Sequence, residues 1–140
     1  MGFFSMLTLL IVDNEPQIRR VLTRELGSKF RIVEAGDYHE AIEVLAEHED
    51  VCAVISDYDF GDGPTGQELF ERLRVSKPAV PRVMISGSLE AHVHASLVVS
   101  GVADLFIKKP WDPGKLGQTV SKLVAERQGV QGSGVPDDAG

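Results

Sequence analysis

Residues 9–16 read LLIVDNEP, an unbroken apolar run that ends abruptly in three polar residues and a proline. A continuous apolar run of this kind is typical of a strand in a parallel sheet that is covered on both faces. Five short runs of β-branched or apolar residues recur along the chain, namely Leu7–Val12, Arg31–Val33 with its flanks, Val51–Ile55, Val80–Ile85 and Ala103–Ile107. They predict five strands.

Segments with helical spacing separate the five runs. In three of them apolar residues recur three or four positions apart, so that each set forms one stripe on a helix. The sets are Ile18, Val21, Leu22 and Leu26, then Tyr38, Ala41, Ile42 and Leu45, then Leu116, Val120, Leu123 and Val124. A helix over residues 89–100 is also expected, although its apolar residues form no single stripe.

Start signals support this reading of the helices. Asp37 precedes Glu40, and Thr65 precedes Glu68, by the three residues of a capping box. Asp112 comes just before Pro113, as a cap before a proline in the first helical position. The alternation of strands and helices predicts an α/β fold, a doubly wound five-stranded parallel sheet. Right-handed crossovers then place the carboxyl ends of all strands at one edge.

The composition is that of one ordinary globular domain. Among 140 residues, 14 Lys and Arg stand against 21 Asp and Glu, giving a net charge of −7, and 43% of the residues are hydrophobic. These values exclude a collagen-like or wholly disordered chain. The acidic balance argues against direct nucleic-acid binding, because a phosphate backbone selects clustered Lys and Arg. The one cysteine, Cys52, lies in an apolar run and is expected to be a buried small hydrophobic residue.

The sequence shows no membrane segment and no export signal. The apolar stretch from Phe3 to Val12 is too short for a bilayer span and lacks the features of an export signal. We therefore expect no membrane contact and a cytoplasmic location. Residues 127–140 are rich in Gly, with Ser, Pro and Asp, and show no periodicity, which predicts a flexible tail or the start of a linker.

Reactive side chains follow four of the predicted strands. Asp13 and Asp57 follow the first and third strands, Ser86 the fourth and Lys109 the fifth. Ligands of such a sheet bind beyond these strand ends. Clustered carboxylates repel one another unless a cation intervenes, and oxygen ligands without His or thiolate suit Mg²⁺. A carboxylate can also attack phosphorus and form an acyl phosphate, whose charge a metal ion and a lysine would neutralise. The pattern predicts that Asp57 accepts a phosphoryl group and Asp13 holds the metal, while Lys109 and Ser86 sense the product.

Four motifs together resemble the receiver domain of two-component response regulators. They are LLIVDNEP at residues 9–16, VISDYD at 54–59, VMISGS at 83–88 and FIKKP at 106–110, and the likeness covers about residues 6–126. The resemblance implies a chemotaxis-regulator-like, (βα)5 flavodoxin-like fold with strand order 2-1-3-4-5. It implies that Asp57 is the phosphoacceptor and that Asp13, Asn14, Asp57 and the backbone carbonyl of Asp59 belong to a Mg²⁺ site. It further implies that Ser86 and Phe106 are switch residues, that Lys109 senses phosphate and that a cis bond precedes Pro110.

The implied function is a phosphorylation-controlled signalling switch, not an enzyme. A sensor histidine kinase or a histidine phosphotransfer protein would donate the phosphoryl group. The added charge would reshape the face made by the fourth helix, fifth strand and fifth helix. That face would act on a downstream protein target or on an effector domain of a longer chain, and phosphorylation could drive a homodimer.

Two features depart from the family pattern. The family usually has two adjacent acids after the first strand, whereas Asn14 is neutral and is expected to weaken the metal site, with Glu15 and Asp59 compensating in part. Asn14, three residues before Gln17 and close to Pro16, is also expected to cap the first helix. The turn-rich loop of residues 60–66 is longer than the commonest family version and is expected to be a connector.

Three other functions remain in view. Asn14 is compatible with a pseudo-receiver, a protein-interaction module that works without phosphorylation. A phosphohydrolase similar to the haloacid dehalogenases would use Asp57 and Asp59 as nucleophile and acid, but in that class the motif follows the first strand. A flavodoxin-like cofactor binder is disfavoured, because the acidic loop after the first strand would repel a flavin phosphate.

Overall fold

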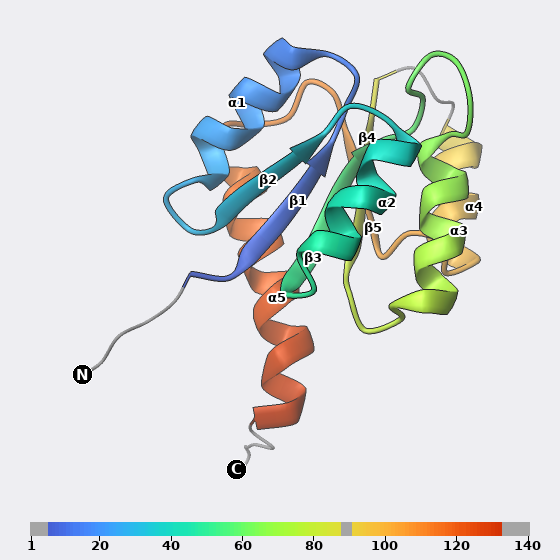
Figure 1. Cartoon of the computed structure of the whole chain (residues 1–140). Coiled ribbons are helices and arrows are strands. Elements are labelled where there is room, and N and C mark those ends of the chain that lie inside the picture. The colour runs from blue at the N-terminus through green and yellow to red at the C-terminus, as the bar shows by residue number, and fades with distance from the viewer. Residues whose placement is uncertain (1–5, 88–90, 133–140) are drawn as a thin grey trace.

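The computed structural model describes residues 6–87 and 91–132, in which five strands alternate with five helices (Figure 1). The strands are β1 (Thr8–Val12), β2 (Arg31–Ala35), β3 (Val51–Asp57), β4 (Arg82–Ser86) and β5 (Leu105–Lys108). The helices are α1 (Pro16–Leu26), α2 (Tyr38–Glu47), α3 (Gly66–Ser76), α4 (Ala91–Val99) and α5 (Lys115–Gly132). All five predicted strands are present, and the expected helix over residues 89–100 corresponds to α4, with its first two residues outside the described part.

The strands form one parallel sheet in the order β2-β1-β3-β4-β5, which confirms the predicted fold class. β1 and β3 are neighbours, with Val12 opposite Ser56, so the residues that follow these two strands start from adjacent places. β4 and β5 pair so that Ser86 lies opposite Lys108. The carboxyl ends of the strands therefore meet along one edge, called the acidic edge below.

Helices cover both faces of the sheet (Figure 1). One apolar layer joins the sheet to α1 and α5, and its buried members include Leu22, Leu26, Leu116 and Val120. The other joins the sheet to α2, α3 and α4 through Leu45, Phe70, Leu73 and Leu97. Successive strand residues face opposite layers, which explains why the central strands are apolar without interruption.

The start of α1 differs from the expected one. Asn14 does not cap this helix: Pro16 is its first residue and Glu15 occupies the cap position, with no side-chain cap bond. The Asp13 carboxylate accepts the Glu15 N–H instead, at 2.9 Å. Proline fixes the first helical position, and this moves the cap one residue beyond Asn14. Two other predicted caps are confirmed, because Asp37 caps α2 and Thr65 and Glu68 form a complete capping box on α3. The cap expected at Asp112, just before Pro113, is wrong, because α5 begins at Lys115.

Helix α5 differs from the expected helix at both of its ends. It begins at Lys115 and not at Pro113, since Gly114 has a φ of +84°, outside the helical range. It continues to Gly132, so the first part of the expected tail, residues 127–132, is helical. Arg127 anchors this extension by binding the Ala79 carbonyl at 2.9 Å and the Asp104 carboxylate at 3.0 Å. Residues 133–140 lie outside the described residues, and within the described ones no helix is long and apolar enough to cross a bilayer.

A buried arginine fastens the opposite end of the sheet. Arg82, only 5% exposed, donates to the carbonyls of Val80, Gly101 and Val102 at 3.0–3.2 Å. Its backbone N–H also donates to Asp104 at 2.7 Å. These bonds tie the start of β4 to the loop between α4 and β5, and we call them the Arg82 clasp.

Candidate functional site

Asp13 is the most completely fixed residue of the acidic edge. It follows β1 directly and is 1% exposed. Its N–H donates to the Ala35 carbonyl at 3.1 Å, and its own carbonyl accepts a bond from Arg19 at 2.6 Å. One carboxylate oxygen accepts the Glu15 N–H, and the other accepts a bond from Lys109 Nζ at 3.3 Å. The backbone and the carboxylate of Asp13 thus have set positions.

Asp57, the last residue of β3, presents its carboxylate on the same edge. Its Oδ1 accepts the Tyr58 N–H at 2.8 Å, and its Oδ2 lies 3.6 Å from Lys109 Nζ. The side chain is 14% exposed, against 2% for Asp13, so Asp57 is the carboxylate that an incoming group can reach. Gly66 closes the other side of its peptide, because a Cβ there would lie 2.0 Å from the Asp57 carbonyl oxygen.

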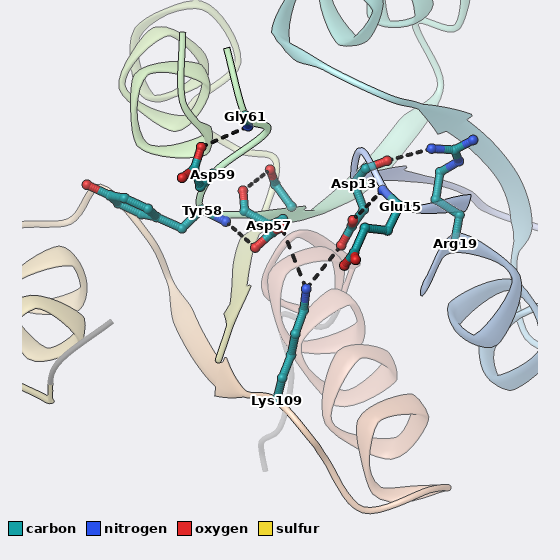
Figure 2. A network of polar contacts seen from close by, with 9 residues as sticks. Asp13, Glu15, Arg19, Asp57, Tyr58, Asp59, Gly61 and Lys109 are labelled. Carbon is teal, nitrogen blue, oxygen red and sulfur yellow. Dashed lines mark hydrogen bonds and ion pairs between the residues drawn. The ribbon is translucent and has the colours of Figure 1, made fainter. Parts of the chain in front are cut away.

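Lys109 joins the two carboxylates (Figure 2). It follows β5, its N–H donates to the Ser86 carbonyl at 3.0 Å, and its peptide bond to Pro110 is cis, as the resemblance implies. The side chain extends across the edge, so that its ammonium stands between Asp13 and Asp57. Sequence positions 13, 57 and 109 are therefore brought into one ionic group.

The charge balance of this group favours a reactive carboxylate. Burial raises the pKa of Asp57, the Asp13 carboxylate raises it further, and the Lys109 ammonium opposes both effects. A raised pKa means that the ionised carboxylate is costly in this place. An added cation or a covalent bond at that oxygen would relieve the cost, and perturbed groups of this kind are common at functional sites.

The other predicted site residues lie around this group in different ways. Ser86 is buried at the end of β4, and Phe106 on β5 is half-buried and packs against the layer of α2, α3 and α4. Asn14 is exposed, and its amide lies 3.8 Å from where a Cβ on Gly61 would be, next to the loop after β3. The Asp59 carboxylate accepts the Gly61 N–H at 2.9 Å and points away from Lys109 (Figure 2).

The side chains of the acidic edge limit the kind of metal ion that this site would bind. In the described part of the chain, no three His, Cys, Asp or Glu side chains stand close enough together to hold a metal. The edge does offer two neighbouring carboxylates in Asp13 and Asp57, and the resemblance adds the uncharged oxygens of Asn14 and of the Asp59 backbone as expected ligands. This set suits Mg²⁺, which usually takes one or two carboxylates and fills its remaining positions with water and phosphate. It does not suit zinc or another ion that prefers nitrogen or sulfur ligands.

Sequence reasoning missed two residues that support the site, Arg19 and Gly66. Arg19 stands on α1 and looks like any charged residue on a helix surface. Gly66 could have drawn notice, because a glycine in the first turn of a helix is unfavourable unless something requires it. No sequence motif links Arg19 to the Asp13 carbonyl or Gly66 to the Asp57 peptide.

The chain is similar to known receiver domains over most of its length. The family model of the response regulator receiver domain matches residues 9–121. The hydrogenase transcriptional regulatory protein HoxA of Cupriavidus necator is 32% identical over 126 residues, which are 89% of this chain and 25% of that protein. The response regulator protein PilR of Pseudomonas aeruginosa is 37% identical over 122 residues, covering 84% of this chain and 26% of that protein. The chain thus spans about a quarter of the length of these relatives.

Solved structures show the same fold. The signal receiver domain of an HD domain-containing protein from Pseudomonas fluorescens aligns with a TM-score of 0.81 at 21% identity, over 94% of this chain and 96% of that one. The receiver domain of NtrX from Brucella abortus aligns with a TM-score of 0.74 at 25% identity, over 84% and 98%.

Proposed function

The chain belongs to the response regulator receiver domain family, and from this premise we propose that it is the phosphoacceptor switch of a two-component phosphorelay. Asp57 would take a phosphoryl group from a sensor histidine kinase or a histidine phosphotransfer protein in the presence of Mg²⁺. The observation that carries the proposal is the Lys109 ammonium, 3.3 Å from the Asp13 carboxylate and 3.6 Å from that of Asp57.

The transfer needs a carboxylate that is ionised, fixed and accessible. One Asp57 oxygen would attack the phosphorus of a phosphohistidine, so that an O–P bond forms while the N–P bond breaks and the imidazole leaves with the bonding pair. The Tyr58 N–H, 2.8 Å from Oδ1, fixes the plane of the carboxylate. Orientation of the attacking group is a large part of catalysis in reactions of this type.

Asp13, Asp57, the carbonyl of Asp59 and the amide oxygen of Asn14 are the residues that would hold Mg²⁺. When bound, the ion would neutralise negative charge on the phosphoryl oxygens. Lys109 would contribute a second positive charge from its present position. Ser86 would sense the phosphoryl group, and Phe106 would then change its packing beside α4.

A substitution pair tests the proposal. Wild-type protein, Asp57→Asn and Asp59→Asn are incubated with acetyl phosphate and MgCl₂, and intact-mass spectrometry counts the phosphoryl groups. We expect one group on wild-type protein and on Asp59→Asn, whose carboxylate lies in the loop, and none on Asp57→Asn. Undiminished labelling of Asp57→Asn would overturn the proposal. Repeated turnover of a small phosphate ester would instead favour a phosphohydrolase.

The pseudo-receiver is a second candidate because the exposed Asn14 replaces an acid. The substitution Asn14→Asp separates the two functions. A receiver takes up a phosphoryl group with Asn14 in place and gains Mg²⁺ affinity from the added charge. A pseudo-receiver takes up none until the acid is restored.

Output and partners belong to the same proposal. A downstream protein or an effector domain in a longer chain would read the face of α4, β5 and α5, and phosphorylation could pair two copies of the chain. We place this signalling in the cytoplasm.

A further inference from the structure

Arg19 links α1 to two other parts of the chain, the Asp13 backbone and Glu34. Figure 2 shows the first of these links. Its Nη1 donates to the Asp13 carbonyl at 2.6 Å, and its Nε donates to the Glu34 carboxylate on β2 at 2.9 Å. Thr23, one helical turn further on, also donates to Glu34 at 3.4 Å. The Arg19 side chain is 21% exposed, so most of it is shielded from solvent.

The bond to Asp13 fixes a peptide plane that matters to the acidic edge. The Asp13 carbonyl belongs to the peptide that leads into Asn14, so its direction sets where both side chains leave the backbone. The Asp13 N–H is already bound to β2, and one carboxylate oxygen is bound to the Glu15 N–H. Arg19 supplies the remaining backbone constraint and fixes the loop just after β1.

Glu34 holds the Arg19 side chain in the position from which it binds the Asp13 carbonyl. A long side chain loses rotamer freedom when it is held in one place, and a second bond reduces the freedom left to lose. Glu34 holds the Nε of Arg19 in a charge-assisted bond, while Nη1 binds the Asp13 carbonyl. Arg19 therefore connects β2 to the backbone of Asp13, whose carboxylate would hold the metal.

We propose that Arg19 is a positioning residue of the phosphoacceptor site, acting on Mg²⁺ binding through the Asp13 backbone. This inference rests on the proposed function. Residues that orient metal ligands commonly change metal affinity by about 10–100-fold when they are replaced. Because Arg19 acts through one carbonyl, we expect the lower end of this range.

The experiment compares Arg19→Met, Arg19→Lys and the control Arg24→Met, which removes an exposed arginine from the same helix. Amide hydrogen exchange of residues 13–15 is measured by NMR without metal, and the same samples are then titrated with MgCl₂. In Arg19→Met we expect faster exchange in these amides and an increase of about tenfold in the Kd for Mg²⁺. Arg19→Lys, which keeps one donor and the charge, should recover part of both effects, and Arg24→Met should match wild-type protein.

The outcomes separate the two proposals. Unchanged exchange at residues 13–15 in Arg19→Met, or a Kd equal to that of Arg24→Met, overturns the role of Arg19. Failure of the wild-type chain to bind Mg²⁺ overturns the proposed function on which that role rests. If Arg19→Met instead caused a general loss of structure, amide exchange would become faster throughout the sheet, and Arg19→Lys would recover neither effect. That result would also overturn a positioning role.

Discussion

We expect Lys109→Met to lower the free energy of unfolding by about 2 kcal/mol at pH 7. The substitution keeps the length of the side chain but removes the charge between Asp13 and Asp57. Two carboxylates would then face each other with no cation between them, and one of them, Asp13, has a side chain only 2% exposed.

The magnitude follows from the two distances. With an effective dielectric constant of about 20, separations of 3.3 and 3.6 Å each correspond to about 5 kcal/mol of attraction. Desolvation of the ammonium offsets much of this sum. Breaking a fully buried pair costs about 3–5 kcal/mol. The Lys109 side chain is 20% exposed, so water can enter and the net cost falls below that range.

The dependence on pH has a definite sign. The pKa of Asp57 is raised by burial and by Asp13, and Lys109 holds it down in part. Loss of Lys109 therefore raises this pKa further. A group whose pKa is raised in the folded state contributes stability at pH values below its unfolded-state pKa, which is about 3.9 for Asp. This contribution is lost as the pH rises through the folded-state pKa. The destabilisation should thus be largest at neutral pH and shrink on acidification.

The assay is urea unfolding at pH 7 and pH 4.5, with and without MgCl₂, for wild-type protein, Lys109→Met and the exposed control Lys108→Met. MgCl₂ should stabilise Lys109→Met more than wild-type protein, since the ion supplies the missing positive charge. Equal stability of the two lysine variants at pH 7, or a penalty that grows on acidification, would refute this account of the site.

Three further substitutions or reactions test other features. Gly66→Ala places a Cβ 2.0 Å from the Asp57 carbonyl oxygen, so we expect a loss of about 3 kcal/mol in urea unfolding, together with slower phosphoryl uptake. Arg82→Leu leaves three carbonyls without their donor and should cost about 3 kcal/mol in the same assay. Burial raises the pKa of the Cys52 thiol to about 11, so alkylation by iodoacetamide at pH 8 should be about a hundredfold slower than that of free cysteine.

The sheet was predictable because burial on both faces imposes a long-range rule on each strand. β1 and β3 are apolar at nearly every position, so they could be recognised without knowing their neighbours. The parallel arrangement then places Asp13, Asp57 and Lys109 on one edge. Their contact through one ammonium depends on strand order, which the sequence carried only through its likeness to a family.

Local rules failed where tertiary contacts compete with them. Asn14 has the residue type of a helix cap, but Pro16 and the Asp13 carboxylate determine the start of α1. α5 continues beyond the residue at which the apolar pattern stops, and Arg127 in this extension binds Ala79 and Asp104, which are distant in sequence. The expectation that Cys52 is buried is wrong, because this residue lies at the start of β3 and is only partly buried.

The Arg82 clasp has a consequence for how this domain could transmit a signal. Arg82 is the first residue of β4, whereas Ser86 is the last. The clasp binds the loop that joins α4 to β5. One end of that helix is thus tethered while the other lies beside the acidic edge. If the acidic edge rearranged, the end of α4 beside the edge would move more than the end held by the Arg82 clasp, and the helix would rotate about the held end. A partner would then read the angle of the helix and not a sideways displacement.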